Sequence, residues 1–121
     1  MSVNKVILVG NVGTAPEVRY VGTRPVATLS LATNEPARTA ADGTAVPERT
    51  EWHRIIMWDK AAETAERYIS KGTKLYIEGK LRTRQYQDRN AITRSVTEII
   101  VDTFDILSRP TATNQPGQSP A

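Results

Sequence analysis

Two tryptophans, one tyrosine and several basic residues are separated by even numbers of positions within two segments of this sequence. Trp52, Arg54 and Trp58 share one parity in the segment 50–58, whose composition predicts a β-strand. Successive strand side chains point to opposite faces, so we expect these three to project from one side of a sheet. A second segment repeats the alternation with Lys80, Arg82, Arg84 and Tyr86. A lone tryptophan is more often a core residue, but rings interleaved with cations are typical of surfaces that stack on bases and hold phosphates.

The positive charge is concentrated in one stretch of the chain. The whole sequence has 16 Lys and Arg against 13 Asp and Glu, a formal net charge of +3. Residues 80–94 contain five basic residues and one acid, a net of +4, so all other residues together sum to −1. This distribution predicts a polyanion-binding surface, although a solvated basic hairpin would have the same charge pattern.

The composition argues against several other kinds of site. The chain has no cysteine and one histidine, His53, so disulfides, thiolate metal sites and histidine clusters are ruled out. We expect no metal and no other cofactor. No apolar run approaches the ~18 residues that span a bilayer, and the first ten residues lack a secretory cleavage pattern. We therefore expect no membrane association and a cytoplasmic, nucleoid-associated location.

Five strands and one helix would position these residues. Apolar alternation predicts strands over 3–20, 26–33, 50–58, 73–86 and 93–107, with a bend at Gly79, and a polar loop over 34–48. Helical spacing predicts a helix over 59–71, with Asp59 capping its start and Gly72 stopping it.

This order of elements predicts a mainly all-β fold. Three strands, a helix and two strands are the order of the OB-fold, a five-stranded Greek-key barrel with its helix between strands three and four. We expect this domain to occupy residues 1–108. Residues 109–121 lack acidic and large apolar side chains, so they are predicted to be a disordered linker or tail.

Catalysis is the alternative from a different functional class. Glu98, Asp102 and Asp105, with His53, could be imagined as a metal-dependent nuclease site. Glu98 and Asp102 should point to one face of their strand and Asp105 to the other. Acids that alternate with Ile100 and Phe104 are more typical of a solvated strand face. A loop at 10–13 resembles the backbone clamp of KH domains, but Pro16 follows where a helix would be needed. We therefore expect a binding protein and not an enzyme.

Several blocks of the sequence resemble the bacterial single-stranded DNA-binding protein family. They are residues 3–11, 16–20, 31–33, 50–54, 71–72, 76–79 and 81–84, which occur in the family's order. The resemblance implies a homotetramer of OB-fold subunits that binds single-stranded DNA with little sequence preference during replication, recombination and repair. It implies base stacking on Trp52, Trp58 and Tyr86. It implies phosphate contacts from basic residues, Lys5, Arg54, Lys60, Lys71, Arg82 and Arg84, and subunit contacts from His53, Tyr76 and Glu78. The alternation along 80–86 adds Lys80 to the predicted phosphate-binding residues.

The sequence departs from the family pattern in two places. Many relatives carry a further stacking aromatic where this chain has Ala37, so we expect weaker contact there. The family also ends in an acidic, partly hydrophobic tip that recruits replication and repair proteins, but residues 111–121 contain no acid and no bulky apolar residue. We expect the tip to lie beyond residue 121; the alternative is a protein without this recruitment.

The residues alone leave two points open. Neither stacking nor charge detects the 2′-hydroxyl, so an OB module that binds RNA, or one that binds only protein, remains an alternative. A dimer also remains an alternative to the tetramer.

Overall fold

The computed structural model describes residues 1–110, and most of them lie in β-strands. The strands are β1 (Val6–Val21), β2 (Arg24–Glu35), β3 (Arg38–Thr39), β4 (Ala45–Val46), β5 (Arg49–Trp58), β6 (Lys74–Gln87) and β7 (Thr93–Ser108), with helix α1 (Lys60–Tyr68) between β5 and β6. Five strands close a barrel in the order β1-β2-β5-β7-β6. The predicted five-stranded barrel with one helix is confirmed. The tail predicted over 109–121 lies almost wholly outside the described residues.

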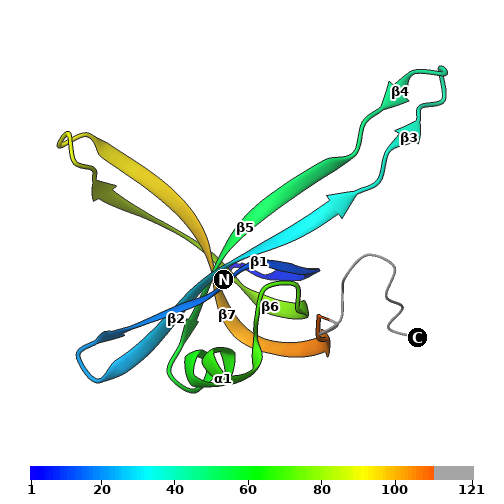
Figure 1. The fold of residues 1–121 in the computed structure, drawn as a ribbon. Helices are drawn as coiled ribbons and strands as arrows, with labels where there is room; N and C mark the ends of the chain where they lie inside the picture. The colour runs from blue at the N-terminus through cyan, green and yellow to red at the C-terminus, as the bar shows by residue number, and fades with distance from the viewer. Residues whose placement is uncertain (111–121) are drawn as a thin grey trace.

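Long ribbons extend from the barrel in different directions (Figure 1). One is formed by the far ends of β2 and β5 and continues into β3 and β4, while another is formed by β6 and β7. We call them the β2–β5 arm and the β6–β7 arm. The arms carry strand residues that the barrel does not bury.

The prediction of an irregular loop over 34–48 is wrong in part, because this segment contains the β3–β4 hairpin. Gly43 adopts a φ of 88°, and the Asp42 carboxylate accepts a hydrogen bond from the Thr44 backbone N–H at 2.9 Å. An Asp-Gly pair of this kind is a standard turn signal, so the hairpin could have been found in the sequence.

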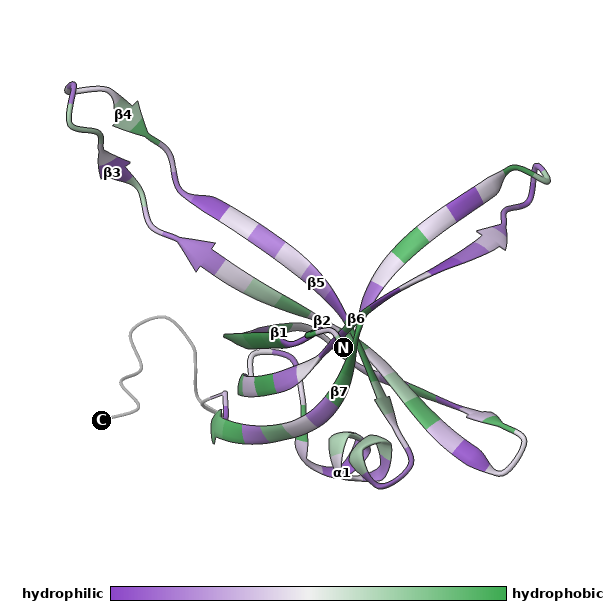
Figure 2. Ribbon diagram, turned by 180° about the vertical axis from the view of Figure 1, so that it is seen from behind, coloured by the Kyte–Doolittle hydropathy of each residue, from purple (hydrophilic) through white to green (hydrophobic). Residues whose placement is uncertain are grey.

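The core lies inside the barrel and is closed at one end by α1 (Figure 1). On β5, Ile55 and Met57 are fully buried, and they pack in one cluster with Leu29, Leu31, Leu75 and Ile77. Helix α1 contributes Ala62 and Ala65 to the same cluster. Hydrophilic and hydrophobic bands alternate along the strands (Figure 2), as expected where one face packs and the other meets solvent.

The predicted start of the helix at Asp59 is correct, but the predicted side-chain cap and the predicted end need correction. Asp59 precedes α1, but its side chain makes no capping hydrogen bond and instead binds Arg24. The helix ends at Tyr68, before Gly72, because Ile69 already has extended backbone and buries its side chain. Gly72 instead occupies a turn with a φ of 93°, where its N–H bonds the Val12 carbonyl.

Close strand contacts require glycine where the barrel bends. The β6–β7 register shifts between Glu78 and Gly79, which agrees with the bend predicted at Gly79. A Cβ built on Gly79 would lie 2.3 Å from the Ile100 carbonyl oxygen, and one on Gly10 would lie 2.2 Å from that of Ala32. Backbone oxygens cannot move away as the end of a side chain can, so these two positions exclude any larger residue.

We predict that Gly79→Ala destabilises the fold by about 1–3 kcal/mol, because the strands must separate to admit a methyl group. Urea denaturation would measure this free energy of unfolding. Gln85→Ala, at an exposed position of the same strand, should stay within about 0.5 kcal/mol of the parent. If the parent, Gly79→Ala and Gln85→Ala were equally stable, the close contact between Gly79 and the Ile100 carbonyl would be contradicted.

Candidate nucleic-acid interface

Trp52 lies on the outer face of the barrel, at the start of the β2–β5 arm. Its side chain is 59% exposed, because the inward positions of β5 are taken by residues of the other parity. Trp52 borders an open groove of about 460 Å³ whose other walls come from β1, β2 and β5 and include Thr14, Arg19, Ser30 and Arg54. A Cβ on Gly13 would come within 2.3 Å of the indole ring, so the bare backbone there leaves room for it.

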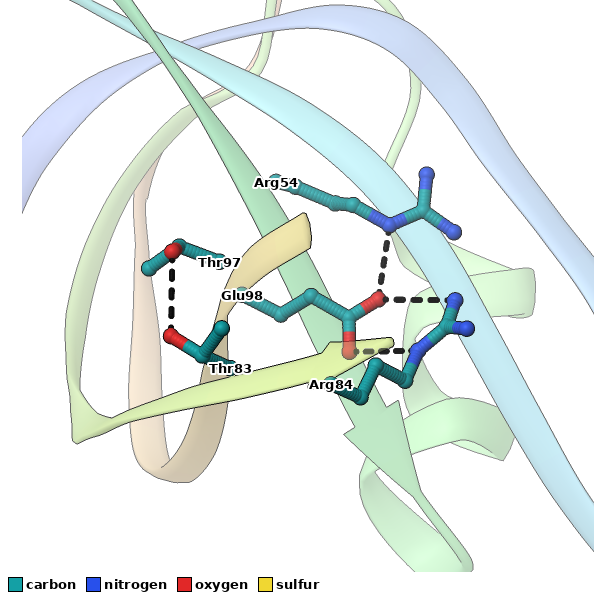
Figure 3. A network of polar contacts seen from close by, with 5 residues as sticks. All are labelled: Arg54, Thr83, Arg84, Thr97 and Glu98. Atoms are coloured by element: carbon teal, nitrogen blue, oxygen red, sulfur yellow. Dashed lines mark hydrogen bonds and ion pairs between the residues drawn. The ribbon is translucent and has the colours of Figure 1, made fainter. Parts of the chain in front are cut away.

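A charged network joins β5, β6 and β7 beside this groove (Figure 3). The Glu98 carboxylate accepts a hydrogen bond from Arg54 Nε at 2.7 Å. It also accepts bonds from Arg84 Nε at 3.1 Å and from Arg84 Nη2 at 3.3 Å. Glu98 is only 4% exposed, so the expectation that it belongs to a solvated strand face is wrong. Sequence alternation missed its role because the two arginines lie on other strands.

The arginines determine the ionisation of Glu98. Burial acts to raise the pKa of this carboxyl and is the largest single influence, but the combined hydrogen bonds and charges of Arg54 and Arg84 lower the pKa below its ordinary value. Glu98 therefore stays ionised at neutral pH, and it fixes the direction of two guanidinium groups whose side chains are 43% and 45% exposed.

Tyr86 lies on the β6–β7 arm, near the same network. The residue is 45% exposed, and Arg84 Cζ lies 5.9 Å from the ring centroid. A second hollow, of about 300 Å³, is lined by Arg54, Arg84, Tyr86 and Val96. Because Arg54 borders both hollows, it connects the Trp52 groove with the Tyr86 hollow.

Trp58 is at the other end of β5, away from both hollows. The β2–β5 register pairs Trp52 with Ala32 and Trp58 with Val26, so the two indoles are on one side of the sheet, as the parity predicts. Ile56 lies between them and is 6% exposed, so the aromatic surface is interrupted. The Trp58 ring is half-buried, and the Arg24 guanidinium covers one of its faces.

The other predicted phosphate-binding residues fall into two groups. Lys5 forms an ion pair with Glu78 at 3.1 Å. Lys60, Lys71, Lys80 and Arg82 have no acidic partner among residues 1–110. Lys60 borders a separate hollow between α1 and β7 and not the Trp52 groove, and Lys71 borders neither aromatic hollow. Arg19 and Arg24 are cations beside the indoles that the sequence reading did not select.

The residues predicted to join subunits lie in two places. Tyr76 donates a short hydrogen bond to Glu78, which lowers the pKa of that carboxyl and raises the pKa of the phenol. Beside them on β1, the side chains of Ile7 and Val9 are exposed. His53 is on β5, where its Nε2 lies 2.9 Å from Thr33 Oγ1 of β2.

The described residues offer neither a metal site nor a membrane helix. Among residues 1–110, no group of three or more His, Cys, Asp or Glu is arranged to hold a metal ion. The same residues include no helix with the length and apolar character needed to cross a membrane.

We predict that Glu98→Gln destabilises the protein by about 1–3 kcal/mol at pH 7, because two arginines lose their charged partner. Since the folded-state pKa of Glu98 is depressed, its stabilisation is present above the unfolded value near 4.5 and disappears as pH falls through the lower folded value. The difference between parent and variant, measured by urea denaturation at pH 7 and at about pH 3, should therefore shrink in acid.

Asp102→Asn is the matched control, because Asp102 is an exposed carboxylate on the same strand. It should change stability by less than about 0.5 kcal/mol at either pH. A Glu98→Gln protein as stable as its parent at pH 7 would show that the network contributes nothing to folding.

Known proteins resemble this chain in sequence and in fold. The model of the Single-strand binding protein family matches residues 3–107. A single-stranded DNA-binding protein of Bacteroides thetaiotaomicron is 53% identical over 109 residues, which make up 89% of this chain and 68% of that protein. A solved structure, the Plasmodium falciparum SSB complex with ssDNA, is similar at a TM-score of 0.76 and 36% identity, over 87% of this chain and 93% of that one. The resemblance in the sequence blocks is thus confirmed, and the chain belongs to the single-strand binding protein family.

Proposed function

We propose that this protein binds single-stranded DNA, stacking bases on Trp52, Trp58 and Tyr86 while basic side chains contact the phosphates. The observation that carries this proposal is the exposed Trp52 indole, which borders an open groove next to Arg54. Names of similar proteins support the choice of ligand, since one is a single-stranded DNA-binding protein and another was solved with ssDNA. Every base has a flat face, so stacking of this kind gives little sequence preference.

The two kinds of cation contribute differently to binding. Arg54 and Arg84 are held by Glu98 and have part of their charge compensated, so they serve mainly to orient the strand between the Trp52 groove and the Tyr86 hollow. Lys60, Lys71, Lys80 and Arg82 have no acidic partner among residues 1–110 and supply most of the attraction for phosphate. The proposed function is binding and not catalysis, because Glu98, one of the three carboxylates of the imagined nuclease site, is occupied by two arginines.

We also propose that the protein assembles as a homotetramer and acts in replication, recombination and repair in the cytoplasm. Exposed Ile7 and Val9, beside Tyr76 and Glu78, support a subunit contact on the outer face of β1 and β6. Sedimentation equilibrium that gave a monomeric mass would contradict the assembly.

Recruitment of replication and repair proteins through an acidic tip, which is absent from residues 1–121, belongs to the same proposal. The cellular role would be contradicted if the protein failed to support the growth of cells that lack their own single-stranded DNA-binding protein.

Trp52→Ala should weaken binding to poly-dT by about 1–3 kcal/mol, the typical loss for one base stack. Quenching of tryptophan fluorescence during titration with poly-dT measures the affinity of the parent, and anisotropy of labelled poly-dT compares the variants. Tyr68→Ala removes an exposed aromatic from α1 and should leave the affinity unchanged. Absence of binding to both poly-dT and poly-U would refute the proposed function, while tighter binding to poly-U would change the ligand to RNA.

The salt dependence of the same titration tests the phosphate contacts. Four unpaired cations, each releasing about 0.7 counterions from a single strand, predict that log affinity falls with log salt at a slope near −3. Arg82→Gln should make this slope shallower by about 0.7. Arg67→Gln removes the same charge from the last turn of α1 and should leave the slope unchanged. A parent slope near zero would eliminate the electrostatic part of the mechanism.

A further inference from the structure

Arg24 is placed over Trp58 by a specific set of contacts. It is the first residue of β2, and its Cζ lies 4.6 Å from the centroid of the indole. Its Nε and Nη2 donate to the two carboxylate oxygens of Asp59, at 3.0 and 2.8 Å. A paired, two-point bond of this kind fixes the orientation of a guanidinium as well as its position. Arg24 therefore forms a second layer above the ring.

Asp59 is itself held in an unusual conformation. Its φ of 57° and ψ of −123° lie outside the regions that L-residues normally occupy. Two backbone hydrogen bonds maintain it: the Asp59 N–H donates to Pro25 O at 2.9 Å, and Asp59 O accepts from the Glu63 N–H at 3.1 Å. Strained residues of this kind concentrate at ligand-binding sites. Here the strained backbone accompanies a carboxylate that binds Arg24 and leaves the helix N–H groups uncapped.

The charge of Arg24 is largely compensated where it stands. The hydrogen bond from Arg24 is the main reason that the pKa of Asp59 lies below its ordinary value, so the pair remains ionised at neutral pH. The side chains of Arg24 and Asp59 are 59% and 53% exposed, so the ion pair itself adds little stability. The main effect of the pair is to fix the Arg24 guanidinium on the outer side of the half-buried Trp58 indole. Bases stack on such planes as well as on aromatic rings.

We propose that Arg24 is a further DNA-contact residue: a base that arrives at Trp58 stacks on the guanidinium of Arg24, which Asp59 positions over the indole. This proposal rests on the proposed function and refines it at one of the three aromatic positions. Trp58 then supports the stack from below, and Trp52 remains the ring that a base touches directly. The two tryptophans should consequently give different signals when DNA binds.

Single-tryptophan proteins separate the two signals, because the chain contains only two tryptophans. In a Trp52→Phe protein, Trp58 is the sole reporter. Poly-dT should quench it weakly, and adding Arg24→Ala should increase the quenching about twofold or more, because the base then reaches the indole. Arg24→Lys retains the charge but not the plane, and should behave like Arg24→Ala. Asp59→Asn releases the guanidinium from its position and should give an intermediate value.

The Trp58→Phe protein, in which Trp52 is the sole reporter, is the matched control. Its quenching should be strong and should not change on Arg24→Ala. The salt slope of binding should also be unaffected by Arg24→Ala, to within about 0.3.

Equal quenching of Trp58 with and without Arg24 would overturn the proposal, and so would the absence of any quenching of Trp58 in either protein. A salt slope that Arg24→Ala made shallower by about 0.7 would also overturn it, because it would mean that Arg24 contacts a phosphate. Loss of quenching at Trp52 in the control would instead count against the proposed function.

Discussion

The short seam between β5 and β7 is the constraint on which the rest of the structure depends. These strands pair in parallel through only two residue pairs, Ile55 with Ile99 and Ile56 with Ile100, yet this pairing closes the barrel. Glu98 and Arg54 come immediately before the first pair and join the strands through their side chains. Arg84 attaches β6 to the same carboxylate. Because a buried carboxylate is costly unless it is paired, both arginines are needed where they stand.

The same network sets a compromise between folding and binding. A guanidinium that is fixed by Glu98 is directed outward with little freedom, so under the proposed function it would lose less entropy on binding a phosphate. Its attraction for phosphate is reduced, because a negative charge is already in contact. The unpaired lysines and Arg82 have the opposite properties, with full charge and greater freedom. Oriented cations beside the aromatic hollows, with unpaired cations elsewhere on the surface, suit a ligand that is flexible and varies in sequence.

Features that depend on local alternation were predictable, and those that depend on contacts between distant segments were not. The parity of Trp52 and Arg54 was sufficient to expect them on the outer face, and the order of elements was sufficient to expect the barrel. The burial of Glu98 depends on arginines 44 and 14 residues away in the sequence, which no strand pattern reveals. Arg24 and Asp59 are 35 residues apart, and their pairing removed the cap that a local reading assigns to Asp59. The sequence placed the end of α1 too late, because Gly72 is a typical helix stop. The chain leaves the helix earlier, where Ile69 becomes extended and buries its side chain.

The β6–β7 arm has a consequence for how this protein can change over generations. Nearly all residues from Leu81 to Val96 are exposed, so they add little to the hydrophobic core. Apart from Arg84, which pairs with the buried Glu98, substitutions there should change the free energy of folding little. Inward-facing positions such as Ile55 and Leu75 have no such freedom, since each is fully enclosed. Under the proposed function, selection can therefore change the affinity for the ligand through the β6–β7 arm, while the enclosed positions of the barrel tolerate few substitutions.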